Sequence, residues 1–106
     1  MLIDANNDSV VRELKDGDTI SKSDYRRFSI EAITDGPAES VVFTSNGRDV
    51  RTESFEPYLI ASDWYGDFHP WNVSNGTYEI TATPFTADSA GGLEGEARTI
   101  TVTVRR

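Results

Sequence analysis

Alternation of apolar and polar residues over short segments is the feature that most constrains the fold of this chain. In the segments 77–83 and 99–104, every second residue is apolar, and most residues between them are threonine. A period of two places successive side chains on opposite faces, as in a β-strand. Both segments are therefore predicted to be strands with one buried face. The residues predicted to face inward are Tyr78, Ile80, Ala82, Ile100, Val102 and Val104.

Similar short segments recur along the rest of the chain, separated by Gly, Asn, Asp and Pro. Helical periodicity is almost absent. Asn46-Gly47 is predicted to join two strands as a hairpin, because this pair readily adopts the positive φ angles of a two-residue turn. The Gly-, Ala- and Ser-rich segment 84–98 is expected to be a long loop, either mobile or functional. The other expected extended segments are 2–5, 10–14, 19–20, 25–33, 40–44, 50–53 and 58–61.

Seven or eight such strands within 106 residues predict an all-β fold. Each sheet alone would expose its apolar face to water, so we expect two antiparallel sheets packed as a sandwich. A chain of this length suits one domain, residues 1–106. The sequence has no cysteine, so this sandwich has no disulfide, and thiolate nucleophiles and Cys-based zinc sites are excluded.

Charge and hydropathy narrow the range of partners. The net charge of −8 repels nucleic-acid phosphates, so no nucleic-acid partner is expected. No segment has the length and hydrophobicity of a membrane span, so no membrane insertion is expected. As an isolated module the chain is expected to be a monomer. Met1 directly precedes a strand-like segment, which we interpret as a start codon added to a module of a longer chain.

The segment from Gly76 to Ala82 resembles strand F of an immunoglobulin-like sandwich. In that strand a tyrosine near the start bonds back to the backbone and forms the tyrosine corner. Tyr78 matches this tyrosine, and Ile80 stands where antibody domains carry their second cysteine. The resemblance implies an immunoglobulin-like sandwich of the cysteine-free bacterial type.

Nearly the whole chain, from Leu2 to Val104, resembles immunoglobulin-like modules of large secreted or surface proteins of environmental bacteria. Such modules often lie beside carbohydrate-active domains, so the resemblance implies an extracellular or cell-surface location and neighbouring domains of the same chain as partners. It carries over no catalytic residue. The matching pieces are 2–5, 14–20, 40–43, 51–53, Pro57-Tyr58, Gly66-Asp67-Phe68, Pro70-Trp71 and 76–85.

The stretch SDWYGDFHPW, residues 62–71, holds four aromatic residues. Phe68 and Trp71 fall on framework positions of the module pattern, and Trp71 is expected to pack over an edge of the sandwich. Trp64 and Tyr65 depart from that pattern and are expected to be partly exposed. An exposed aromatic ring can stack on the apolar face of a sugar or contact a partner domain. The candidate carbohydrate-binding residues are Trp64, Tyr65, His69 and Trp71.

Asp63 and Asp67 flank Gly66 and make up a candidate calcium site. Their spacing differs from that of an EF-hand, and the alternative is turn chemistry, in which aspartate side chains accept hydrogen bonds from nearby backbone N–H groups. A nearby cation, Arg51, is expected to pair with Asp49, Asp63 or Asp67. No cofactor other than calcium is indicated.

Three hypotheses of function follow. The first is a non-catalytic accessory module of an extracellular bacterial multidomain protein, with a spacing, supporting or interaction role. The second is a carbohydrate-binding module that stacks the aromatic residues of 64–71 on a polysaccharide. The third is a calcium-stabilised adhesin repeat. Enzyme activity is not expected, because the lone His69 has no apparent catalytic partner and a small sandwich lacks a deep cleft.

Overall fold

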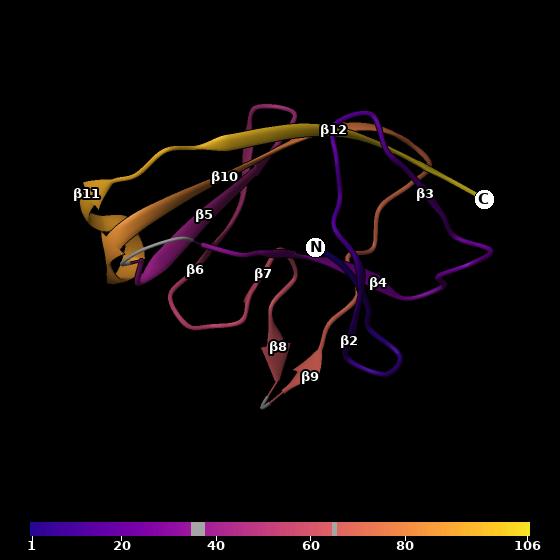
Figure 1. Cartoon of the computed structure of the whole chain (residues 1–106), viewed down its shortest axis with the longest axis horizontal. Helices are drawn as coiled ribbons and strands as arrows, with labels where there is room; N and C mark the ends of the chain where they lie inside the picture. Colours follow the sequence, from indigo (N-terminus) through magenta and orange to yellow (C-terminus); the bar gives the residue numbers. More distant parts are fainter. Residues whose placement is uncertain (35–37, 65) are drawn as a thin grey trace.

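Two β-sheets pack face to face in the computed structural model, which describes residues 1–34, 38–64 and 66–106 (Figure 1). The first sheet has the strand order β2-β1-β4-β7 and the second β3-β12-β10-β5-β6, with β11 paired to β10. The first sheet consists of β1 (Leu2–Asp4), β2 (Ser9–Arg12), β4 (Phe28–Ala32) and β7 (Tyr58–Leu59). The second consists of β3 (Thr19–Ser21), β5 (Ser40–Ser45), β6 (Arg48–Glu53), β10 (Gly76–Ala87), β11 (Gly91–Glu94) and β12 (Arg98–Arg105).

The core lies between the two sheets, as the alternation predicted. Ile80, Val102 and Val104 are buried in one cluster with residues of the first sheet such as Leu2 and Phe28. Tyr78, Ala82 and Ile100 are only partly buried and pack against this cluster. On the outer face of the second sheet, threonines face each other across β10 and β12, and the hydroxyl oxygens of Thr81 and Thr99 are 2.8 Å apart. The predicted all-β sandwich is confirmed.

The strand order is that of an immunoglobulin-like fold. Strand β10 lies between β5 and β12, as strand F lies between C and G in such sandwiches. Among the described residues, ten strands make up the two sheets, and β8 and β9 pair as a separate two-stranded ribbon. One pairing departs from the expected antiparallel pattern, because β3 runs parallel to β12. Thr19 of β3 pairs with Thr103 of β12, and Ser21 pairs with Arg105.

The Asn46-Gly47 hairpin forms as predicted. Ser45 pairs with Arg48, and the two turn residues have φ angles of +53° and +80°. Asn46 also extends the sheet toward β10, because its backbone N–H donates to the carbonyl of Glu79 and its side-chain oxygen accepts from the N–H of Glu79, each at 2.8 Å. The turn residues therefore set both the hairpin and its position against the central strand.

The segment 84–98, expected to be a long loop, is largely ordered into strands, so that expectation was wrong. Strand β10 continues through Pro84 to Ala87, a short 3-10 turn follows at Asp88–Ala90, and β11 pairs back onto β10. A proline normally interrupts a ladder because it has no N–H to donate. Pro84 is tolerated because the pairing of β10 with β12 has already ended at Ala82↔Arg98, and its carbonyl still accepts a 2.8 Å hydrogen bond from Gly95.

Three side chains of the first sheet are fully buried although they face away from the core. Ile3, Ser29 and Leu59 alternate with core residues on their strands, and each is 0% exposed. The two-stranded ribbon of β8 (Asp63–Trp64) and β9 (Asp67–Phe68) lies on this side of the sheet (Figure 1). The two ends of the segment that carries the ribbon lie alongside β4, because the N–H groups of Ile60 and Trp71 donate to the carbonyls of Ile30 and Phe28 at 2.9 and 2.7 Å.

Candidate functional site

The β8–β9 ribbon carries most of the candidate binding residues. Trp64 pairs with Asp67 across the tip, and Asp63 pairs with Phe68. Gly66 adopts a φ of +87°, which suits a glycine in a tight turn, and its N–H donates to Oδ2 of Asp63 at 2.9 Å. Tyr65 lies outside the described residues. Asp63 therefore has the turn role that was one of the two alternatives for it.

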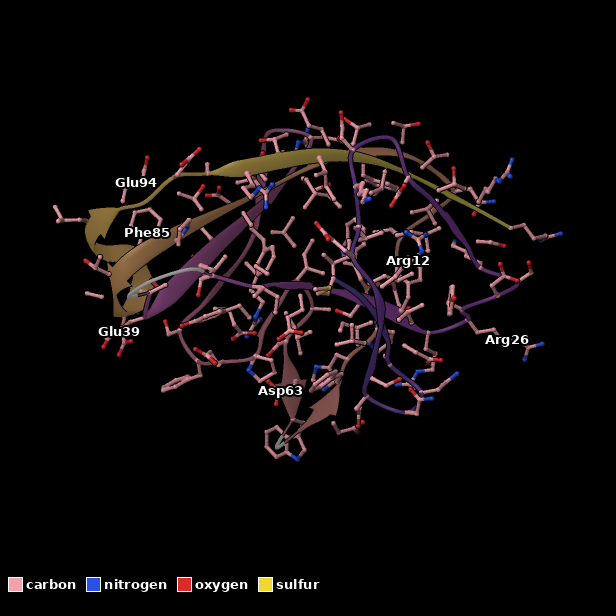
Figure 2. The ribbon with its side chains drawn as sticks, in the orientation of Figure 1. Arg12, Arg26, Glu39, Asp63, Phe85 and Glu94 are labelled. Carbon is pink, nitrogen blue, oxygen red and sulfur yellow. The ribbon has the colours of Figure 1, made fainter. Side chains whose placement is uncertain are left out.

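Hydrogen bonds at its base attach the ribbon to the sandwich. The N–H of Phe68 donates to Oδ1 of Asp8 in the β1–β2 turn at 3.0 Å, and the N–H of His69 donates to the carbonyl of Ser62 at 3.1 Å. The ribbon thus spans from the end of β7 to the β1–β2 turn. Figure 2 shows the labelled Asp63 at this ribbon, which projects away from the two sheets.

Trp64 is exposed at the tip of the ribbon. Its side chain is 67% exposed, which is unusual for a residue of this size. His69 is also exposed, at the base of the same ribbon. The structure thus presents an indole ring to solvent on a short, anchored ribbon, and such a ring can stack on a flat apolar surface.

Trp71 belongs to the core. It is 8% exposed, and its indole meets Phe28 edge-on at a centroid distance of 6.2 Å and Tyr78 at 5.4 Å. Its backbone N–H also donates to the carbonyl of Phe28 at 2.7 Å. These contacts agree with its expected packing over the sandwich and leave little of the ring for a ligand. The two tryptophans therefore have separate environments.

The acidic residues of the ribbon do not gather into a larger group. Among the described residues, no cluster of three or more His, Cys, Asp or Glu side chains is placed to hold a metal ion. Arg51 does not reach Asp63 or Asp67: its Nε lies 3.2 Å from Oε2 of Glu53, two residues along the same strand face. The expectation that Arg51 pairs with one of three aspartates was wrong, because its same-face neighbour Glu53 lies closer. The calcium site at Asp63 and Asp67 stays a prediction.

A second candidate site lies at one end of the sandwich and was not found from the sequence. It is an open hollow where three connections meet: the β4–β5 segment, the β6–β7 segment and the turn after β10. Its lining residues are Ala38, Glu39, Ser54, Phe55, Glu56, Tyr58 and Asp88. No spacing in the sequence indicates this hollow, because the three connections are far apart along the chain.

Hydrogen bonds among the three connections and the strand ends beside them hold the hollow in shape. The hydroxyl of Tyr58 donates to the carbonyl of Ala38 at 2.9 Å. The buried hydroxyl of Ser40 donates to the carbonyl of Ala87 at 2.6 Å and accepts from the N–H of Ala90 at 3.0 Å. The N–H of Ser89 donates to Oγ of Ser54 at 3.0 Å. Each bond joins two segments that are at least 20 residues apart in the sequence.

The hollow has a negative electrostatic environment. The pKa of Tyr58 is raised, first by burial of its hydroxyl and then by the carboxylates of Glu56, Glu39 and Asp88. A nearby negative charge disfavours the phenolate for the same reason that it favours a cation. The hollow therefore suits a positively charged group better than a neutral or negative one.

Comparison with known proteins supports the fold. No family model matches the sequence, and no curated protein does. A solved structure of Clostridium thermocellum CbhA fibronectin(III)-like modules is similar to this chain with a TM-score of 0.55 at 15% sequence identity, over 99% of this chain and 96% of that chain. At this identity the likeness shows the fold alone, and the fold is an immunoglobulin-like sandwich. Within the described residues, no helix is long and apolar enough to span a membrane.

Proposed function

We propose that this chain is a non-catalytic accessory module of an extracellular bacterial multidomain protein, in which it spaces or supports neighbouring domains. The observation that carries the proposal is the end-to-end likeness to bacterial fibronectin(III)-like modules, which covers 99% of the chain. A fold by itself hosts many functions, so the proposal also needs a physical basis in this chain.

The physical basis is the single core that the two sheets share. The two sheets share one cluster of buried residues, and the molecule measures 40 × 29 × 21 Å along its principal axes. The edge strand β6 (Arg48–Glu53) is rich in charged residues and contains a register shift opposite Phe43 and Thr44, and both features discourage pairing with another strand. A closed core with a protected edge suits an element that holds other domains apart.

The spacer role can be tested by placing the chain between two fluorescent reporter domains. We expect single-molecule energy transfer to give one narrow distance distribution. The matched control is a Gly/Ser linker of the same length, whose root-mean-square span is roughly 50–60 Å with a broad distribution. A distribution as broad as that of the linker would contradict the spacer role.

A second candidate function, carbohydrate binding, is favoured by the exposure of Trp64. Its indole is 67% exposed on a ribbon attached at both ends, so stacking on a pyranose ring needs little rearrangement. Tyr65 follows it in sequence and His69 is exposed nearby. Aromatic stacking with neighbouring polar groups is a common way to bind a flat, hydroxyl-bearing ligand.

Affinity electrophoresis through gels of xylan, galactomannan or β-glucan tests this second function. If it holds, at least one polysaccharide retards the wild-type protein and Trp64→Ala removes the retardation. Phe55→Ala is a matched control, because Phe55 is 76% exposed but lies in the β6–β7 connection, outside the ribbon. No retardation on any gel, or equal loss in both variants, counts against binding by the ribbon.

A further inference from the structure

Charged side chains are segregated along the longest axis of the molecule. The described residues of the segments 31–39, 54–58 and 84–97 meet at the end that holds the hollow, and the sequence of these segments contains no lysine or arginine. We call this the acidic end. Its described carboxylates are Glu31, Glu39, Glu56, Asp88, Glu94 and Glu96. Figure 2 shows Glu39 and Glu94 together at this end.

The opposite end is positively charged. We call it the basic end, and it is formed by the segment 22–27 and the last residues of the chain. The N–H of Lys22 donates to the carbonyl of Arg105 at 2.7 Å, which joins these two segments. In the sequence of these segments, one side chain is acidic, that of Asp24. Their cations are Lys22, Arg26, Arg27, Arg105 and Arg106. Figure 2 shows Arg26 at this end, across the molecule from Glu39.

Most charges at the two ends have no partner of opposite charge among the described residues. The side-chain ion pairs formed there are Arg12–Asp18 and Arg51–Glu53, and neither belongs to an end. The exception at the acidic end is Glu31, which lies beside the N-terminal ammonium of Met1. Arg26 and Arg27 are exposed, as are Glu39 and Glu56. Each end therefore offers charged groups that an external partner can pair with.

The acidic end also has a shape and an aromatic surface that suit a guanidinium group. The hollow brings Glu39, Glu56 and Asp88 to its rim, and Phe55 at the same rim is 76% exposed. Guanidinium groups stack on aromatic faces and pair with carboxylates at once, which ammonium groups do less well. Arg26 and Arg27 of the basic end supply that chemistry.

Distance and screening allow this attraction despite the net charge of −8. The molecule is 40 Å long, whereas the Debye length is about 10 Å at 0.1 M ionic strength. Charges on the far end of a partner are therefore strongly screened, and the two ends that meet decide the sign of the interaction.

We propose that the basic end of a second copy of this chain docks on the acidic end, with Arg26 and Arg27 of that copy over Phe55 and the carboxylates of the hollow. Such a contact is heterologous, so successive copies join head to tail. The cross-section perpendicular to the longest axis is 29 × 21 Å, which limits the total buried area to about 1,000 Å² and makes the contact weak. The proposal goes beyond the accessory role and does not depend on it.

Sedimentation of the wild-type protein from about 20 µM to about 2 mM tests this contact, since linked modules face each other at millimolar effective concentrations. We expect the average mass to rise with concentration at low salt. The association constant should fall at least about tenfold in 0.5 M NaCl. Arg27→Glu should weaken association, while Arg48→Glu, an exposed reversal on β6 with the same change in net charge, should leave it intact.

A charge swap sharpens the test. The variant Arg26→Glu/Arg27→Glu has two acidic ends, and Glu39→Lys/Glu56→Lys has two basic ends, so each variant alone should stay monomeric. In a mixture, an acidic end of the first variant can meet a basic end of the second, so the two should associate although both keep a net negative charge. A wild-type mass that stays monomeric up to about 2 mM at low salt would overturn the proposal. Equal loss with Arg48→Glu, or an arginine-rich peptide that binds the hollow without any self-association, would also overturn it.

Discussion

The hydroxyl of Tyr78 donates a 2.7 Å hydrogen bond to the backbone carbonyl of Ser74, four residues earlier. This is the tyrosine corner that the resemblance of Gly76–Ala82 to strand F implied. The bond fixes the turn that leads into β10, while the ring of Tyr78 packs against Trp71. One side chain thus joins the entry of the central strand to the core.

Removal of this hydroxyl should lower the stability measurably. Tyr78→Phe keeps the ring but loses the bond, so we expect the free energy of unfolding to fall by about 0.5–1.5 kcal/mol in urea titrations. Tyr25→Phe is the control, because the hydroxyl of Tyr25 makes no hydrogen bond within the described part of the chain. Equal losses in the two variants would show that the tyrosine corner contributes nothing of its own.

The two tryptophans should differ strongly on substitution. Trp71→Ala removes a buried ring that contacts Phe28 and Tyr78, and we expect a loss of about 3–5 kcal/mol, enough to threaten folding. Trp71→Phe should be milder and keep the variant measurable. Trp64→Ala should change the stability by no more than about 0.5 kcal/mol, because the ring is exposed. Similar effects at both positions would contradict the separate environments assigned to them.

Replacement of two buried serines by alanine should have different effects on stability. Ser40→Ala leaves the Ala87 carbonyl and the Ala90 N–H without their side-chain partner, so we expect a loss of about 1–3 kcal/mol. Ser29 is 0% exposed, and its hydroxyl has no hydrogen-bond partner in the described residues. Ser29→Ala should therefore be neutral or stabilising. Thermal unfolding of both variants checks the pair, and a loss at Ser29 comparable to that at Ser40 would refute the difference.

Acid should weaken the loop before β3. The pKa of Asp18 is lowered, first by the backbone N–H of Lys15 and then by the Arg12 guanidinium. A lowered folded pKa adds stability above the unfolded value, and this stability is lost as the pH falls through the lower folded value. We expect wild-type stability to decline below about pH 3.9, the ordinary aspartate value, with a shallower decline in Asp18→Asn. Identical pH profiles would contradict a role for the Asp18 charge.

The accessory and calcium hypotheses predict different responses to chelation. If the chain is a calcium-stabilised repeat, EDTA should lower the melting temperature, and Asp63→Asn/Asp67→Asn should remove that response. If it is an accessory module without calcium, the melting temperature should be the same in EDTA and in millimolar calcium. Differential scanning calorimetry distinguishes the two, and a calcium response that survives the double substitution would place any site elsewhere.

Local patterns predicted most of the framework. The alternation over 77–83 and 99–104 predicted β10 and β12, and Asn46-Gly47 predicted the β5–β6 hairpin, because each depends on neighbouring residues alone. The continuation of β10 through Pro84 could not be predicted in this way. It depends on where the partner strand β12 stops, and that is a property of the assembled sheet.

The candidate sites were predictable only in part. The sequence separated Trp71 from Trp64 through the framework pattern, and the structure agrees that the first is buried and the second exposed. It did not indicate the β8–β9 pairing, since four strand residues around a turn carry little signal. The hollow could not be predicted from the sequence, because Glu39, Glu56 and Asp88 meet only after three distant connections fold together. Sugar and calcium binding stay predictions.

The parallel pairing of β3 with β12 has a mechanical consequence. These two strands come from opposite halves of the chain and pair over three residues, from Thr19↔Thr103 to Arg105↔Ser21. Tension that reaches them from opposite termini drags the parallel strands past each other lengthwise, so their hydrogen bonds bear the load together. Rupture of this pairing under such a pull requires its hydrogen bonds to break together, whereas a pull across the strands would break them one after another.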